Sequence, residues 1–264
     1  MKQTDAVPPA LFVSHGAPDI LSSTHESLGA LRDLAVRLPR PTAIVVVSAH
    51  WVAEPIGVTV GEPLRTIHDY RGFPDELYAR QYPASGDRRL ATDVTRQLAA
   101  QGLDCQVHEA RGLDHGAWIP LATLFPAADI PVVQVSLPTG PVANLVRLGA
   151  ALEALRQCGM LIVGSGGSTH NLRQLNRTGR TDAWAREFEQ WLLDHVEHGR
   201  FDRLTDPAGF PPLFHRAHPT LEHFAPLLVA WAAGNPAQPG QRLHHSFSYG
   251  NLGMSQFAFG AEAG

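Results

Sequence analysis

The sequence contains few cysteines, no long apolar run and no block of basic charge, and each absence excludes a class of protein. Its two cysteines, Cys105 and Cys158, lie outside any CxxC pair. We therefore expect free thiols in a reducing, cytoplasmic environment and no disulfide framework. No apolar run approaches the roughly 20 residues of a membrane span. No run of basic residues exceeds a pair and the net charge is −4, so neither a membrane nor a nucleic acid is an expected partner.

The stretch 1–12 also lacks the long apolar segment and the small-residue cleavage site that are typical of a signal peptide. The composition is that of an ordinary globular protein, because 44% of the 264 residues are hydrophobic and 17% are charged. A chain of this length buries roughly three-quarters of the surface that it exposes when unfolded, so a large core is available. Since no linker-like stretch or repeat is visible, we predict a single domain over residues 1–264.

Short apolar segments bounded by proline, glycine or polar residues alternate with stretches of helical periodicity. The strand-like segments lie at 9–16, 41–51, 55–61, 104–110, 131–138 and 159–167. The helical stretches lie at 27–39, 85–102, 140–159, 181–199 and 218–234. This alternation predicts an α/β fold with a mixed or mainly parallel central sheet flanked by helices.

The last part of the chain is harder to interpret. Residues 200–217 are polar and interrupted by prolines, so we expect a long irregular loop near the functional site. The helix expected over 218–234 should have Pro219 in its first turn, followed there by Glu222 and His223.

Three of the apolar strands are each followed by a histidine: His15, His50 and His170. Open α/β sheets bind ligands beyond the carboxyl ends of their strands. If these strands are parallel neighbours, the three imidazoles converge at one edge of the sheet. Imidazole is a good ligand for iron, zinc, copper and nickel, although a single histidine in such a place more often caps or packs, and the spacing is not that of an HExxH motif.

Two further histidines have informative surroundings. His115 lies in a glycine-flanked turn beside Asp114, which either orients the ring or caps a helix that begins near Trp118. A cation is disfavoured at a helix N-terminus, so we expect His223 to be neutral, and the neutral imidazole is the form that binds metal.

The glycine-rich stretch 164–167 suggests two other functions that the sequence does not support. It lacks both the GxGxxG pattern and the P-loop lysine of phosphate sites. Ser165 lacks the GxSxG frame of a nucleophilic serine. The stretch therefore predicts a flexible connection to His170.

Several segments, taken together, resemble one known family. They are "HGAP", "VVVSAHW", "TIHDYRGFPDELYARQYPASG", "DHGAW", "GSGGSTHNL", "HPTLEHFAPLLVA" and "SYGNLGMSQFAFG". In this order, between residues 11 and 260, they resemble the DODA-type extradiol aromatic ring-opening dioxygenases. These belong to the class III extradiol enzymes, together with the protocatechuate 4,5-dioxygenase catalytic subunit.

The resemblance implies non-haem Fe(II) as the cofactor for activity and allows for Zn²⁺ in the purified protein. It places His15, His50 and His223 at metal-ligand positions. It places His170 at a histidine assigned either as an acid/base or as a fourth metal ligand. It makes His115 a catalytic histidine that contacts substrate or oxygen.

One departure from the protocatechuate branch bears on the metal. That branch binds iron through two histidines and one glutamate, whereas here His223 occupies the glutamate's place and Glu222 lies beside it. An all-histidine set lowers the negative charge at the metal and favours Zn²⁺, which suits tetrahedral nitrogen ligation.

The resemblance also implies the reaction: a small aromatic diol, DOPA-like or another catechol, is opened by O₂ to a muconic semialdehyde. The loop "TIHDYRGFP" carries His68, Tyr70 and Arg71, which either bind the substrate or form a solvated turn. Two other functions stay open for the same histidines: a zinc-dependent hydrolase and a non-catalytic Memo-like relative. The chain is expected to be a monomer or a homodimer.

Overall fold

The computed structural model describes residues 7–261, and the predicted domain 1–264 extends beyond them at both ends. Ten strands make up an eight-stranded sheet, ordered β4-β3-β5-β2-β6-β1-β10-β7, and a separate pair, β8 and β9. The strands are β1 (Ala10–Ser14), β2 (Ile44–Val52), β3 (Ile56–Thr59), β4 (Cys105–His108), β5 (Val132–Leu137), β6 (Leu161–Gly166), β7 (Gln241–His244), β8 (Phe247–Ser248), β9 (Leu252–Gly253) and β10 (Gln256–Phe259).

The four central strands β5, β2, β6 and β1 are parallel neighbours. On the two sides of this group, β3 runs antiparallel to β5 and β10 runs antiparallel to β1. The prediction of a mixed or mainly parallel sheet is thus confirmed. Because β1, β2 and β6 are neighbours and parallel, their carboxyl ends lie at one edge of the sheet. This is the condition under which His15, His50 and His170 are expected to converge.

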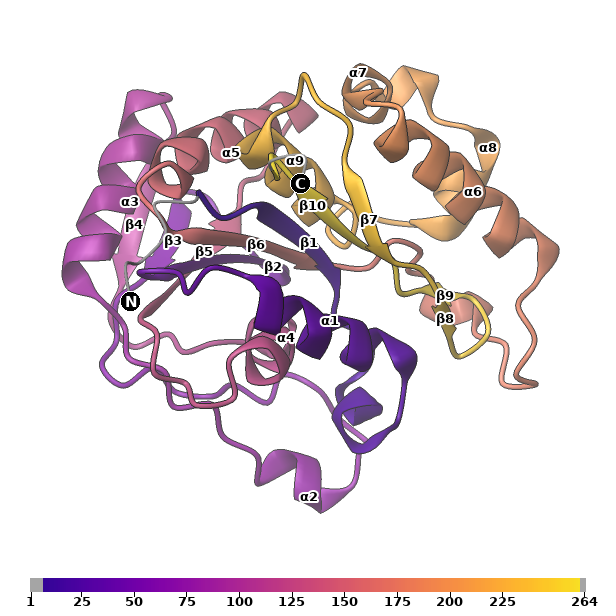
Figure 1. The fold of residues 1–264 in the computed structure, drawn as a ribbon, viewed down its shortest axis with the longest axis horizontal. Coiled ribbons are helices and arrows are strands. Elements are labelled where there is room, and N and C mark those ends of the chain that lie inside the picture. The colour runs from indigo at the N-terminus through magenta and orange to yellow at the C-terminus, as the bar shows by residue number, and fades with distance from the viewer. Residues whose placement is uncertain (1–6, 262–264) are drawn as a thin grey trace.

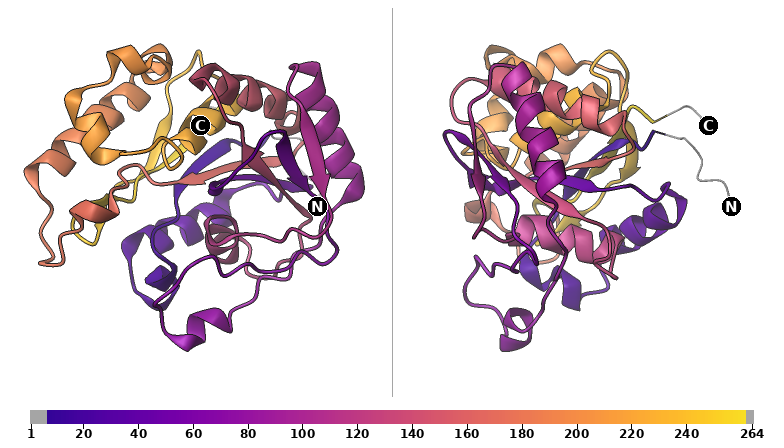
Figure 2. Two further views of the ribbon diagram at one scale, coloured as in Figure 1. Left: turned by 180° about the vertical axis from the view of Figure 1, so that it is seen from behind. Right: turned by 90° about the vertical axis from the view of Figure 1, so that its left-hand side faces the viewer.

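Helices cover both faces of the sheet (Figures 1 and 2). The helices are α1 (Glu26–Arg37), α2 (Asp75–Tyr78), α3 (Arg88–Ala100), α4 (His115–Leu124), α5 (Val142–Arg156), α6 (Ala183–Glu197), α7 (Phe201–Thr205), α8 (Pro212–Ala217) and α9 (Ala225–Gly234). In β2, Val45 and Val47 face the core under α3, α5 and α9, whereas Ile44 and Val46 face the core under α1 and α4. Successive side chains of a strand point to opposite faces, so one continuous apolar run supplies both cores.

The prediction of an irregular loop at 200–217 is wrong, because this stretch forms the short helices α7 and α8. Phe201, Leu204 and Phe214 are buried and give these helices an apolar side. Pro212 is the first residue of α8, a position where proline favours a helix because the missing N–H has no partner there in any case.

The last predicted helix begins later than expected: α9 starts at Ala225, and Pro219 and His223 precede it. The reason is a close contact between backbones. The carbonyl of His223 accepts a hydrogen bond from the Gly167 N–H at 3.0 Å and approaches Gly166 so closely that a Cβ there would lie 2.1 Å away. His223 is therefore held by β6 and the loop after it rather than by a helical turn.

The sequence predicts no strand after residue 167, yet β7 to β10 lie there. β10 pairs with β1 and extends the sheet beyond the parallel group. This pairing brings the segment Leu252–Met254 beside the carboxyl ends of β1 and β6, where it forms one wall of the functional site. Among the described residues, no helix is long and apolar enough to cross a membrane.

Candidate active site

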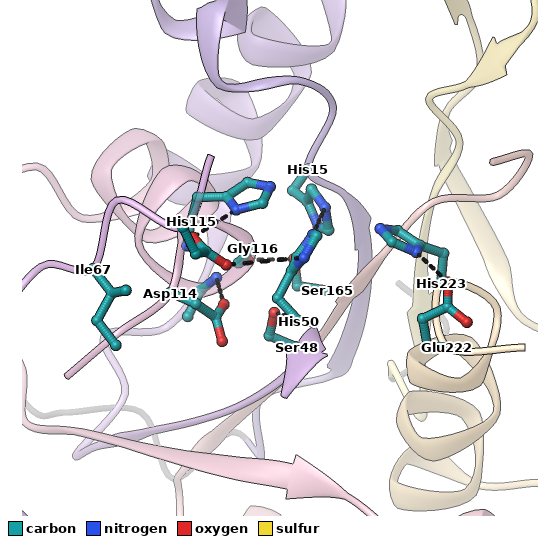
Figure 3. Close-up of polar contacts among 12 residues, drawn as sticks. His15, Ser48, His50, Ile67, Asp114, His115, Gly116, Ser165, Glu222 and His223 are labelled. Carbon is teal, nitrogen blue, oxygen red and sulfur yellow. Dashed lines mark hydrogen bonds and ion pairs between the residues drawn. The ribbon is translucent and has the colours of Figure 1, made fainter. Parts of the chain in front are cut away.

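Three histidines converge at the carboxyl edge of the sheet (Figure 3). His15 directly follows β1, His50 lies near the end of β2, and His115 is the first residue of α4. One ring nitrogen of each lies within 4.8 Å of the others. The Nε2 atoms of His15 and His50 are 3.1 Å apart. Two nitrogens that bind the same metal ion at about 2.0–2.1 Å, in adjacent ligand positions, lie roughly 3 Å apart. The His15–His50 pair therefore has the spacing of a metal site.

A glycine makes the convergence of these rings possible. Gly116, the second residue of α4, lies against the two strand-end histidines. A Cβ on it would lie 2.4 Å from Ser48 Oγ, 3.0 Å from His50 Cδ2 and 3.2 Å from His15 Cε1. Only a residue without a side chain allows the start of α4 to approach the rings this closely.

The hydrogen bonds of His15 determine which of its nitrogens is free. Ser165 donates its hydroxyl hydrogen to the Gly116 carbonyl. Its oxygen therefore accepts from His15 Nδ1, which lies 3.0 Å away. In the neutral ring the proton is on Nδ1, so Nε2 presents a lone pair to His50 and to the site. Ser165 is thus an orienting residue.

Asp69 orients His115 as Ser165 orients His15, by accepting a hydrogen bond from the ring Nδ1. Asp69 is not among the predicted site residues. Its carboxylate accepts from the ring Nδ1 of His115 at 2.8 Å and from the backbone N–H of His115 at 3.0 Å. Burial alone would raise the pKa of Asp69, but the hydrogen bonds from His115 lower it to about 2. The second oxygen lies 3.9 Å from His50 Nδ1.

Asp114, the other candidate partner of His115, is the N-cap of α4. Its carboxylate accepts from the Ala117 N–H at 3.1 Å and also from the side chains of Gln134 and Arg111. The two alternatives raised by its position are therefore resolved in favour of capping. The helix begins at His115 rather than near Trp118.

His223 reaches the same cluster from the segment before α9 (Figure 3). Its ring centroid lies 4.9 Å from that of His50 and 5.6 Å from that of His15. Nδ1 faces Glu222 Oε1 at 3.2 Å, and this contact lowers the pKa of Glu222 to about 2. Among the described residues, the buried Nε2 has no hydrogen-bond partner. A buried nitrogen left unpaired costs about 1–3 kcal/mol, which a bound cation would offset.

His170 completes the group by stacking on His223, with centroids 3.4 Å apart and planes 5° from parallel. Its backbone N–H donates to the Ala217 carbonyl at 3.0 Å, which ties the loop after β6 to the end of α8. Burial, together with the charge that the neighbouring His223 would carry, lowers the pKa of His170 to about 3. The ring is therefore neutral near pH 7.

Burial and mutual repulsion keep the strand-end histidines neutral as well. Burial, followed by the charges that His50 and His115 would carry, lowers the pKa of His15 well below its usual value. Burial and the same kind of repulsion lower the pKa of His50 to about 2, although Asp69 opposes the shift. Neutral imidazole is the form that metal binding requires.

The five histidines line a cavity of about 300 Å³. Apolar side chains, among them Phe73, Leu252 and Met254, form most of the remaining wall. Of the three residues of the 66–74 loop proposed for substrate binding, only Tyr70 lines this cavity. Its hydroxyl donates to the Leu77 carbonyl, so the ring rather than the hydroxyl is offered to a ligand.

The other two residues of this loop lie elsewhere. The ring of His68 packs edge-on against Trp118 and Tyr70, and its Nε2 pairs with the Arg80 carbonyl at 2.9 Å. Arg71 lines a neighbouring outer groove and not the cavity itself. The structure therefore brings Tyr70 to the histidine cluster and leaves these two side chains outside it.

A buried carboxylate outside the cavity accepts hydrogen bonds from two of the segments that line it. Glu189 of α6 is fully buried and accepts hydrogen bonds from Thr169, next to His170, and from Ser255, both at 2.6 Å. Burial would raise the pKa of Glu189, but hydrogen bonds from His245, Ser255 and Thr169 keep it below its ordinary value. This carboxylate fixes the loop that carries His170 against the segment 252–255.

Comparisons with known proteins show the family of this chain. Residues 7–260 match the family described as the catalytic LigB subunit of aromatic ring-opening dioxygenase. The chain is 34% identical to a 4,5-DOPA dioxygenase extradiol from Beta vulgaris, over 98% of this chain and 99% of that protein. It is 36% identical to a protein of the same name from Escherichia coli K12, over 96% of this chain and 94% of that protein.

A solved structure shares the fold. The crystal structure of an uncharacterized protein from Escherichia coli K12 superposes with a TM-score of 0.77 at 32% identity, over 96% of this chain and all of that one. The protein is thus an enzyme of the extradiol dioxygenase class. Within that class, the chain belongs to the LigB family of aromatic ring-opening dioxygenases. Neither a zinc-dependent hydrolase nor a non-catalytic relative is supported by these matches.

Proposed function

We propose that this enzyme is a metal-dependent extradiol dioxygenase that opens a catechol, DOPA-like or another dihydroxybenzene, with O₂ to a muconic semialdehyde. The observation that carries the proposal is the inward-facing set of imidazole nitrogens. The Nδ1 atoms of His15, His115 and His223 are turned outward to an oxygen partner. The names of the relatives, which are 4,5-DOPA dioxygenases, support a catechol as the substrate.

We propose His15, His50 and His223 as the metal ligands. His115 competes with His223 for the third place, because its nitrogen lies within the 4.8 Å group. The unpaired, buried Nε2 of His223 supports the first set. Imidazole binds both candidate metals, and Fe(II) is proposed as the active one because Zn²⁺ has no redox chemistry.

The stacking of His170 on His223 supports an acid/base role for His170. A nitrogen lone pair lies in the plane of its ring, and the two planes are nearly parallel with centroids 3.4 Å apart. One ion shared by both rings would sit well out of at least one plane, although metal–nitrogen bonds are only about 2.0–2.1 Å long. His170 is therefore left free to exchange a proton with the substrate.

The roles of the remaining groups follow from their positions. When bound, the metal would supply a common site for catechol and O₂ and a path for electrons between them. His170, held neutral by burial, accepts a proton from a catechol hydroxyl. His115, whose Nδ1 donates to Asp69, would donate from Nε2 to the reacting oxygen when the ring carries a second proton, and so stabilise negative charge there. Tyr70 packs against the ring of the substrate, and the apolar walls exclude water.

Anaerobic loading with Fe(II), followed by a catechol panel in air, tests the function. We expect a yellow ring-fission product that depends on both iron and O₂. Protein that binds Fe(II) tightly but opens no catechol in the panel would contradict the proposal.

Variants assign the histidines. His170→Ala should lower kcat by about 10²–10⁴-fold and keep the iron, whereas His15→Ala and His223→Ala should lose iron. His198→Ala, at the exposed end of α6, is the control and should keep both. Loss of iron in His170→Ala would instead make His170 a ligand, and full iron in His223→Ala would pass the third position to His115.

A further inference from the structure

The cavity opens into a second and larger groove. The outer groove has a volume of about 810 Å³, compared with about 300 Å³ for the cavity. Four residues line both spaces and form a rim between them: Ala17, Phe73, Leu172 and Leu252. The cavity alone is at the lower end of the range of about 300–1,000 Å³ for small-molecule sites, so a ligand that extends beyond a single ring must pass this rim.

Leu172 at the rim is unusually exposed for its type. Of its surface 61% is accessible, although it lies only two residues from His170. Tyr249, whose side chain is 36% exposed and whose hydroxyl donates to Asp19, lines the same groove. Single exposed apolar residues are common, but two along one groove at the mouth of an active site indicate a surface that a ligand covers.

The rim is also held firmly in place. Leu172 begins a short 3₁₀ helix whose N-cap, Asn171, accepts from the Arg173 N–H at 3.0 Å and donates to the Arg216 carbonyl at 2.6 Å. A preorganised apolar edge binds without losing much conformational entropy. Beyond the rim the groove continues along Phe247 and then along polar side chains, Arg71 and Arg177 among them.

We propose that the rim and the outer groove form a subsite for an extended substituent of the substrate, whose first carbon atoms contact Leu172 and Phe73 as specificity-determining residues. This inference rests on the proposed function and narrows it to catechols that carry a chain of about three or more carbon atoms. With the diol at the histidine cluster, such a chain leads past Leu172 into the groove. It covers the exposed leucine, and apolar contact there favours longer substituents.

Binding without turnover tests the subsite separately from the reaction. Catechol and 4-propylcatechol are titrated anaerobically, by calorimetry, into Fe(II)-loaded and metal-free protein. For the wild type we expect the propyl compound to bind about five- to tenfold tighter, as three half-covered methylene-sized groups would give. Leu172→Ala should reduce this ratio to about twofold. Val36→Ala, an exposed apolar residue of α1 that lines neither space, should keep the wild-type ratio.

Equal affinities of the wild type for the two compounds would overturn the subsite, as would a Leu172→Ala variant that keeps the full ratio. Turnover of unsubstituted catechol in air is measured in parallel. A lack of turnover together with the expected affinity ratios would reject the proposed function and keep the subsite. Turnover without any preference for the propyl compound would reject the subsite and keep the proposed function.

Discussion

Three of the imidazoles at the site are each fixed by a hydrogen-bond partner at Nδ1, and the nature of these partners sets the charge of the site. His15 has the neutral hydroxyl of Ser165, whereas His115 and His223 have the carboxylates of Asp69 and Glu222. Partners of this kind fix the tautomer and raise the basicity of the ring nitrogen that binds metal. Two carboxylates just outside the cluster thus supply the negative charge that an all-histidine set lacks.

Asp69→Asn tests this arrangement at the level of one residue. The amide oxygen can still accept from His115 Nδ1, but it carries no charge, so His115 stabilises the reacting oxygen less well. We expect kcat/KM for catechol to fall about 10–100-fold, with the thermal midpoint of unfolding within a few degrees of the wild type. Asp33→Asn, on the exposed side of α1, is the matched control. Activity within twofold of the wild type in Asp69→Asn would show that its charge is not used.

The histidines could be found from the sequence, but their partners could not. His15, His50 and His170 each follow an apolar strand, so the fold class alone predicts where they lie. Asp69 comes from an irregular loop 46 residues from His115, and no periodicity links the two. Asp114 is adjacent in sequence to His115, but its position immediately before a helix commits its carboxylate to the cap.

At the scale of secondary-structure elements, the site depends on close approaches that only glycine allows. Gly116→Ala would place a methyl group 2.4 Å from Ser48 Oγ and push α4 away from the strand-end histidines. We expect a loss of about 1–3 kcal/mol in the free energy of unfolding, together with weaker iron binding, measured by urea unfolding and metal analysis.

Gly29 of α1 provides the matched control for this substitution. Among the described residues, nothing lies within 4 Å of a Cβ built there. Gly29→Ala should therefore stabilise the protein by about 0.5–1 kcal/mol, because alanine favours a helix over glycine. Equal effects of the two substitutions would mean that the contact at Gly116 is not tight.

The elements that the sequence analysis predicted wrongly are those that long-range contacts define. The segment before α9 has helical composition, yet its backbone bonds to the loop after β6, and the helix starts only at Ala225. β8 and β9 have two residues each, too few for any periodicity. β10 has four residues and lies between β1 and the edge strand β7. By contrast, β2 and β6 were predictable, because burial on both faces requires a continuous apolar run.

At the scale of the whole molecule, the buried histidines make stability depend on pH. His218 is a separable example, since it lies among Phe188, Phe214 and Phe224 and its Nε2 pairs with the Ser168 carbonyl at 2.8 Å. Burial lowers its pKa from 6.5 to about 4.

Between these two pKa values the unfolded chain binds a proton that the folded protein excludes. Stability must therefore fall as the pH is lowered from 6.5 to 4, by up to about 1.4 kcal/mol per pH unit for each such histidine. His15, His50 and His170, whose pKa values are also lowered, add to the loss in metal-free protein.

His218→Gln isolates the part of the pH dependence of stability that comes from His218. The glutamine amide can still donate to the Ser168 carbonyl, but it does not titrate. Urea unfolding of the metal-free protein at pH 6.5, 5.5 and 4.5 should give a slope of stability against pH that is smaller by about 1 kcal/mol per pH unit than in the wild type. His198→Gln, whose side chain is 59% exposed, should keep the wild-type slope. Identical slopes in all three proteins would mean that His218 takes up its proton in the folded state, and that the aromatic cage around it does not exclude charge.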